Sequence, residues 1–173
     1  MGVEREPNRP VTEFGVEIRG LILDPVSNSP IVILKKPEEN VFLPIWIGVF
    51  EANAIALQLE GVQTPRPMTH DLLRDLISGL GASVTGVLVH ALVENTFHAV
   101  IELQDGSGKA INLDARPSDA IALALRCKAP IRVSEEVFEK AHALDLTSVK
   151  DQDTRLREWL ESLSPEDLGK YKM

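Results

Sequence analysis

The chain has 173 residues, enough for one domain of ordinary size with a terminal appendage but too few for two catalytic domains. Hydrophobic residues make up 44% of the sequence and charged residues 25%, which excludes extensive disorder, collagen-like repeats and a coiled coil. The net charge of −8 produces an overall field that repels polyanions, so any contact with nucleic acid must be local.

Targeting and redox features point to the cytoplasm. Residues 1–12 are mostly polar and show no periodicity, so we expect a flexible N-terminus without a secretory signal. No apolar run approaches the roughly 20 residues that a membrane-spanning helix needs. The single cysteine, Cys127, can form no internal disulfide, and we interpret it as a small buried residue. We therefore expect a cytoplasmic protein with no membrane segment.

The first half of the folded region predicts three strands followed by two helices. The strands cover residues 14–23, 31–36 and 41–47, and the helices cover residues 50–60 and 69–80. Gly61 is a typical residue after a helix end, and Thr69 is expected to cap the second helix. This second helix is amphipathic, with apolar residues at helical spacing: Leu72, Leu73, Leu76, Ile77 and Leu80.

The second half predicts a similar order of elements. Strands are expected at residues 84–93, 96–104, 110–114 and 131–133, and helices at residues 117–127 and 134–144. Pro117 suits the first position of a helix, and Ser134 suits a helix cap. We expect one folded domain over residues 13–146, followed by a linker and helical tail over 147–173. In this tail, a helix at residues 155–163 carries Trp159, which needs an apolar surface on the core or on a second subunit.

An offset of 66 residues aligns the two halves. It places residues 53–59 on residues 119–125 with five identities in seven positions. A duplication would give an α+β fold in which two strand-strand-strand-helix-helix units form one core. The alternative is that Ala-Ile-Ala-Leu is merely a common composition of buried helices.

Polar residues gather at the junction before the helix at residues 117–127. Asp114, Arg116, Ser118 and Asp119 surround a helix N-terminus, where free N–H groups and the helix dipole favour an anion such as phosphate. The alternative interpretation is structural, with Ser118 and Asp119 completing the first helical turn and Arg116 pairing with Asp114. The sequence contains no glycine-rich phosphate loop, nucleophile elbow or paired-histidine zinc motif.

Two further groups could carry chemistry. Glu51 lies at the junction that opens the equivalent helix of the first half, where it either complements the helix dipole or binds a metal. His70 can titrate near neutral pH, Asp71 beside it can hold a divalent metal, and Arg66 is close in sequence. A polar first turn also explains His70 and Asp71. The remaining histidines have no patterned partners and are assigned no role: His90, His98 and His142.

Several segments together resemble the bifunctional nuclease domain family. They are Arg19–Pro25, Leu43–Gly48 with Phe50–Ala56, Arg66–Leu72, Asp114–Arg126 and Ala129–Glu136. The C-terminal stretch Leu163–Lys172 is similar to the tail of bacterial members. The resemblance implies an α+β fold with an internal repeat, a homodimer, and nuclease activity on both DNA and RNA for some members. It implies no catalytic residue set.

Two hypotheses follow. In the first, the protein is a nuclease in which Asp114, Asp119 and Asp71, with Glu51, hold Mg²⁺ or Mn²⁺. His70 then acts as general acid or base, while Arg116, Arg66 and Ser118 bind the phosphate. In the second, the protein is a non-catalytic regulatory module that binds an anion or small ligand at residues 114–119 and acts through protein partners.

Overall fold

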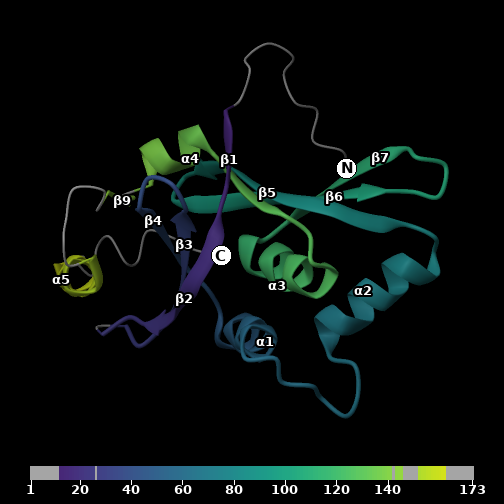
Figure 1. The fold of residues 1–173 in the computed structure, drawn as a ribbon, viewed down its shortest axis with the longest axis horizontal. Helices are drawn as coiled ribbons and strands as arrows, with labels where there is room; N and C mark the ends of the chain where they lie inside the picture. Colours follow the sequence, from purple (N-terminus) through teal and green to yellow (C-terminus); the bar gives the residue numbers. More distant parts are fainter. Residues whose placement is uncertain (1–11, 26, 142, 146–151, 163–173) are drawn as a thin grey trace.

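The computed structural model describes residues 12–25, 27–141, 143–145 and 152–162. Three parts of the sequence lie largely or wholly outside the described residues: the N-terminus expected to be flexible (residues 1–12), the linker expected from residue 147, and His142. The described chain is a mixed α+β fold with two sheets, as predicted (Figure 1).

One sheet has five strands and the other has four. The five-stranded sheet has the order β1 (Glu13–Gly15), β8 (Ile131–Ser134), β5 (Ser83–Val93), β6 (Thr96–Gln104) and β7 (Ala110–Ala115). The four-stranded sheet has the order β2 (Glu17–Leu23), β3 (Pro30–Lys36), β4 (Val41–Trp46) and β9 (Leu144–Asp145). Neighbouring strands are antiparallel except β5 and β8, which are parallel.

A helix follows the third strand of each antiparallel meander. The helices of the described residues are α1 (Val49–Leu59), α2 (Thr69–Gly79), α3 (Pro117–Cys127), α4 (Glu135–Lys140) and α5 (Gln152–Ser162). The order strand-strand-strand-helix thus occurs twice, as β2-β3-β4-α1 and β5-β6-β7-α3, and α1 packs against α3. None of the helices that the structure describes has the length and apolar character needed to cross a lipid bilayer.

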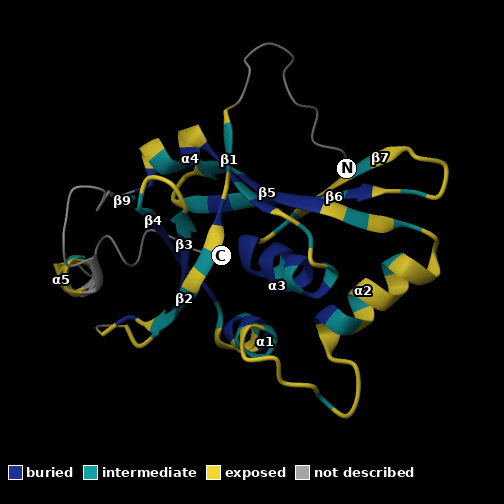
Figure 2. Ribbon diagram, in the orientation of Figure 1, coloured by how far each residue is buried: buried dark blue, intermediate teal, exposed yellow. Residues whose placement is uncertain are grey.

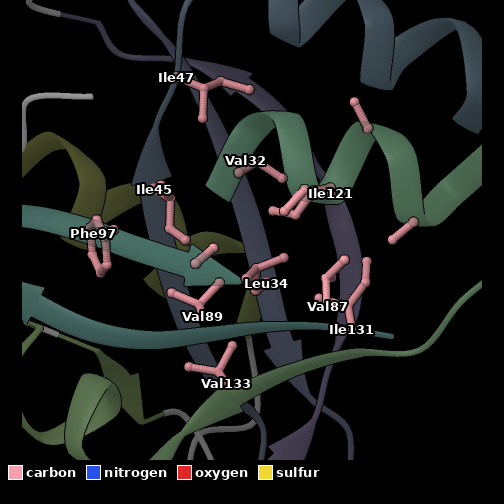
Figure 3. Close-up of a cluster of buried hydrophobic side chains, with 14 of the residues drawn as sticks. Val32, Leu34, Ile45, Ile47, Val87, Val89, Phe97, Ile121, Ile131 and Val133 are labelled. Atoms are coloured by element: carbon pink, nitrogen blue, oxygen red, sulfur yellow. The ribbon is translucent and has the colours of Figure 1, made fainter. Parts of the chain in front are cut away.

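The main core lies between the two sheets and the helices α1 and α3. Side chains from both meanders and from α3 point into it, including Val32 of β3, Val89 of β5 and Ile121 of α3 (Figure 3). The core-facing residues of α1 and α3 therefore share one apolar cluster. The duplication predicted from the offset of 66 stays a prediction.

A second apolar cluster covers the other face of β3. Ile31 and Ile33 alternate with the core residues Val32 and Leu34, so β3 is buried on both faces. Trp159 of α5 packs against this second cluster. The apolar surface that Trp159 requires is therefore provided by its own chain.

The three long helices of the domain differ in burial (Figure 2). Helix α3 is almost wholly buried, whereas α1 buries mainly one side and α2 lies at the periphery. Of the five apolar residues at helical spacing in this region, Leu73 and Ile77 pack against the main core. Leu72, Leu76 and Leu80 are 63%, 56% and 77% exposed, so the apolar side of α2 is only partly covered.

Other differences concern element ends. The strand predicted at residues 14–23 is divided at Val16 into β1 and β2, which belong to different sheets. Met68 rather than Thr69 is the N-cap of α2. Helix α4 ends at residue 140 instead of 144 because the chain continues into β9. Ser134 is the N-cap residue of α4, as predicted, but its hydroxyl donates to the His90 carbonyl oxygen and makes no capping hydrogen bond.

Candidate functional site

The N-terminal ends of α1, α2 and α3 meet at one place. Helix α1 begins directly after β4, and α3 begins after β7 at Arg116, whose extended backbone precedes Pro117 at the first helical position. Helix α2 packs against α3. This packing brings together polar side chains that are up to 68 positions apart in the sequence, from Glu51 to Asp119.

Four of these side chains form a continuous hydrogen-bonded chain, here called the Asp119 network: His70, Asp119, Arg116 and Glu51. His70 Nε2 lies 2.9 Å from Asp119 Oδ1. Arg116 donates from Nε to Asp119 Oδ2 over 2.8 Å and from Nη2 to Glu51 Oε1 over 2.7 Å. The network thus joins the first turns of all three helices.

Exposure divides the network into an inner and an outer part. The side chains of His70 and Glu51 are 10% and 16% exposed, whereas those of Asp119 and Arg116 are 30% and 48% exposed. Asp119 and Arg116 are therefore the members that solvent or a ligand can reach. His70 lies behind Asp119 and holds one of its carboxylate oxygens.

The charges of the network favour a cation over an anion. Hydrogen bonds to Asp119 and Glu51 raise the pKa of Arg116 above its ordinary value, so its positive charge is permanent. Two carboxylates face this one guanidinium, which leaves a formal charge of −1 when His70 is neutral. The predicted pairing of Arg116 with Asp114 is wrong, since Arg116 pairs instead with residues of α1 and α3.

Asp71 belongs to a separate contact with Arg126. Arg126 Nε donates to Asp71 Oδ1 over 2.7 Å, and Arg126 Nη1 donates to the carbonyl oxygens of Ala54 and Ala122. Burial works to raise the pKa of Asp71, but the hydrogen bonds from the Met68 backbone and from Arg126 outweigh it, and the pKa is lowered. This contact ties α2 to α1 and α3.

Asp114 lies on the other side of the sheet from the network. It pairs across the sheet with Val100, whereas the next residue, Ala115, pairs with Ala99 of the main core beneath α3. Because successive side chains of a strand point to opposite faces, the Asp114 carboxylate points away from Asp119. Asp114 is exposed, and no ion pair engages it within the described part of the chain.

The two remaining candidates for phosphate binding occupy contrasting positions. Ser118 is completely buried in the first turn of α3, so its hydroxyl does not face a ligand at the surface. Arg66 is exposed in the loop between α1 and α2, where it lines a cavity together with Asp71. At the N-terminus of α3, Pro117 therefore offers no N–H and the Ser118 hydroxyl is covered.

The four predicted metal ligands do not form a protein-only metal site. Across the described residues, no three or more His, Cys, Asp or Glu side chains are grouped so that they could hold a metal ion. Arg116 contacts Glu51 and Asp119, Arg126 contacts Asp71, and Asp114 lies on the opposite face of the sheet.

Comparison with known proteins gives the family. A family model described as the bifunctional nuclease domain matches residues 32–145. The chain belongs to the bifunctional nuclease domain family. It is 40% identical over 161 residues to an uncharacterized protein of Mycobacterium tuberculosis (strain CDC 1551 / Oshkosh), with 88% of this chain and 96% of that protein covered.

Plant proteins named bifunctional nuclease are more distant. Identity to bifunctional nuclease 2 of Arabidopsis thaliana is 30% over 110 residues, covering 62% of this chain and 33% of the plant protein. For bifunctional nuclease 1 of Oryza sativa subsp. indica, identity is 26% over 116 residues, covering 66% of this chain and 35% of the rice protein. The bifunctional nuclease match contains the whole Asp119 network, whereas β1, β2 and α5 lie outside it.

Sequence reasoning missed Arg126, although this bifunctional nuclease domain depends on it for helix packing. Its side chain is 1% exposed and makes three hydrogen bonds. The available signal was its position at the end of the apolar run of residues 120–125, because a cation in a buried helix requires a partner. The contact between Glu51 and Arg116 was also missed, since it depends on the packing of α1 against α3.

Proposed function

We propose that the protein is a nuclease that hydrolyses phosphodiester bonds of RNA and DNA at the Asp119 network. The single observation that carries the proposal is the continuous hydrogen-bonded chain from His70 through Asp119 and Arg116 to Glu51. Membership of the bifunctional nuclease domain family supports this reaction class. Fold-level similarity alone would not identify the site.

Asp119 and Arg116 carry the chemistry in this proposal. Asp119 is the accessible carboxylate and accepts a proton from the attacking water. Arg116 uses Nε and Nη2 for its carboxylate partners, and within the described residues its Nη1 group has no partner, so its two N–H groups can bind a phosphate oxygen. A bond forms between water oxygen and phosphorus as the bond to the leaving oxygen breaks, and that oxygen takes a proton from solvent.

His70 and Glu51 act as positioning residues. His70 lies behind Asp119 and fixes the direction of its carboxylate, while Glu51 holds Arg116 from the opposite side. The general acid or base role expected for His70 therefore passes to the more exposed Asp119. Asp71 supports the site through Arg126, and Asp114 has no part in it.

Dependence on Mg²⁺ or Mn²⁺ is a separate proposal. Mg²⁺ is commonly bound by one or two carboxylates together with substrate phosphates, rather than by an all-protein cage. Glu51 and Asp119 meet at the same nitrogen of Arg116 and are the two carboxylates suited to this arrangement. We expect such a metal to bind with the substrate and not to the protein alone.

Cleavage of labelled RNA and DNA by highly purified protein tests the main proposal. Asp119→Asn removes the carboxylate with little change in volume and should reduce cleavage by about 100-fold or more, the range typical of general acid–base catalysis. His70→Gln should reduce cleavage less, because His70 positions the Asp119 carboxylate and does not take the proton. Retention of wild-type cleavage by Asp119→Asn would exclude this site.

Three further properties complete the proposal. We propose a homodimer, with the exposed Leu72, Leu76 and Leu80 stripe of α2 as its apolar surface. We propose a cytoplasmic location, which the free thiol of Cys127 supports. We also propose that the two meander-plus-helix units arose by duplication, so that β2-β3-β4-α1 and β5-β6-β7-α3 should superpose with the same handedness.

A further inference from the structure

A cavity lies between the loop that joins α1 to α2, the C-terminal ends of α1 and α3, and the N-terminal half of α2. Its volume is about 450 Å³, within the range of small-ligand sites. The cavity is lined from α1 by Leu57 and Gln58, from α2 by Asp71 and Arg74, and from α3 by Arg126. Residues 61–68 of the loop form the remaining wall.

The cavity is positively charged although the protein is negatively charged. Its lining contains three arginines, Arg66, Arg74 and Arg126, against one aspartate, Asp71. The formal charge of the lining is therefore +2 in a chain whose net charge is −8. An anion is thus attracted to this cavity, in contrast to the negative Asp119 network.

The three arginines are not equally available. Arg126 is occupied by Asp71 and by two carbonyl oxygens, and Arg74 pairs with Asp75 at the surface. The guanidinium of Arg66 has no hydrogen bond or ion pair within the part of the chain that the structure describes. Arg66 is therefore the cation whose donors are open to a ligand.

The loop holds Arg66 in place before any ligand binds. Pro65 and Pro67 flank it and restrict the backbone on both sides. The Thr64 hydroxyl donates to the Arg66 carbonyl oxygen over 2.8 Å. A restricted backbone loses less conformational freedom on binding, and the guanidinium that it carries can bind a phosphate through two N–H groups.

Apolar and amide side chains line the rest of the cavity. Leu57, Val62 and Met68 provide an apolar wall, and Val62 and Met68 are 43% and 36% exposed. The amides of Gln58 and Gln63 can both donate and accept hydrogen bonds. A flat heterocycle with polar edges and an attached phosphate matches this combination better than a simple anion does.

We propose that this cavity binds a nucleoside monophosphate unit, with its phosphate on Arg66 and its base against Val62 and Met68. The assignment of a nucleotide, rather than another anion with a planar group, rests on the proposed nuclease function. His70 and Asp71 are consecutive on α2 and face Asp119 and Arg126, which are about 10 Å apart along α3. The cavity therefore holds a nucleotide about 10 Å along α3 from the proposed cleavage site.

Calorimetric titration of the full chain with AMP, adenosine and inorganic phosphate in EDTA tests the proposal without any cleavage step. AMP should bind more tightly than either fragment. Arg66→Gln should weaken AMP binding about 10-fold or more, as expected for loss of hydrogen bonds to a charged group. Val62→Ser should weaken AMP binding and leave phosphate binding unchanged. Both residues are exposed, and circular dichroism checks that the variants remain folded.

Arg155→Gln is the matched control, because Arg155 lies on α5 in an exposed pair with Glu158. This variant should bind AMP like the wild type. Absence of AMP binding at millimolar concentration, or equal binding by Arg66→Gln, would overturn the proposal. Equal binding of AMP and phosphate would show a simple anion site and also overturn it. Cleavage without AMP binding removes only this proposal, whereas AMP binding without cleavage removes only the proposed nuclease activity.

Discussion

Arg126 of α3 and Asp71 of α2 form an ion pair between residues 55 positions apart, with 2.7 Å between Nε and Oδ1. The Arg126 side chain is 1% exposed and also binds the Ala54 and Ala122 carbonyl oxygens. A single guanidinium thus fixes the relative positions of the three helices whose first turns build the Asp119 network.

Loss of this guanidinium should destabilise the whole domain. Arg126→Met keeps much of the side-chain volume but leaves Asp71 without its partner, and we expect a loss of about 3 to 5 kcal/mol in the free energy of unfolding. Urea unfolding measures the change. Arg155→Met breaks only an exposed pair and should change the free energy by less than about 1 kcal/mol. A similar small change for Arg126→Met would contradict the structural role of the pair.

The same pair should make stability depend on pH in the acid range. The folded-state pKa of Asp71 is lowered, whereas its unfolded-state pKa is about 3.9. Between these two pKa values, the unfolded chain therefore binds more protons than the folded chain. The contribution of Asp71 to the free energy of unfolding is thus complete above about pH 5 and is lost as pH falls through the folded-state pKa. Urea midpoints from pH 7 to pH 3 should fall less steeply for Asp71→Asn than for wild type. Parallel curves would show that Asp71 is not responsible.

Asp114 and Asp119 should differ in their effect on cleavage. Asp119 lies in the network, whereas the Asp114 carboxylate points to the opposite face of the sheet. Asp114→Asn should therefore retain at least about half of the wild-type cleavage rate, while Asp119→Asn loses about 100-fold. Initial rates on the same labelled RNA compare the two variants. A loss of equal size for Asp114→Asn would mean that the substrate reaches both faces.

Metal dependence should appear in cleavage and not in binding to the protein alone. EDTA should abolish cleavage, and added Mn²⁺ should restore it, because the proposed metal needs substrate phosphates besides Glu51 and Asp119. Calorimetric titration of the substrate-free protein with Mn²⁺ should show no tight binding. Cleavage that persists in EDTA would remove the metal from the proposal and leave the Asp119 network in place.

Assembly should depend on the exposed leucines of α2. If the stripe of Leu72, Leu76 and Leu80 forms a homodimer interface, light scattering at micromolar concentration should give twice the chain mass. Leu72→Glu with Leu76→Glu should reduce the mass to that of one chain. Val93→Glu, at an exposed site 53% accessible at the far end of β5, is the control and should not change the mass. A monomeric wild-type protein would exclude the dimer.

Local sequence patterns predicted most elements because each has a strong local cause. Alternating or continuous apolar residues define the strands, and the alanine-rich stretches before Gly61 and after Pro117 define α1 and α3. Element ends were less predictable, since tertiary pairing decided them. Val16 divides a continuous alternating pattern because its two sides join different sheets, and nothing in the local period marks that division.

For the candidate site as well, local features could be predicted from the sequence and tertiary contacts could not. The polar character of Glu51, His70, Arg116 and Asp119 and their places in first helical turns could be read from the sequence. Their partners could not, because an ion pair such as Glu51–Arg116 depends on how α1 packs against α3. Spacing along the chain wrongly favoured Asp114 as the partner of Arg116, because β7 ends at Ala115 and Arg116 belongs to the start of α3, where it meets Glu51 and Asp119. The sequence by itself determined which residues could carry charge at the helix starts, and only the tertiary structure decided which of those charges meet.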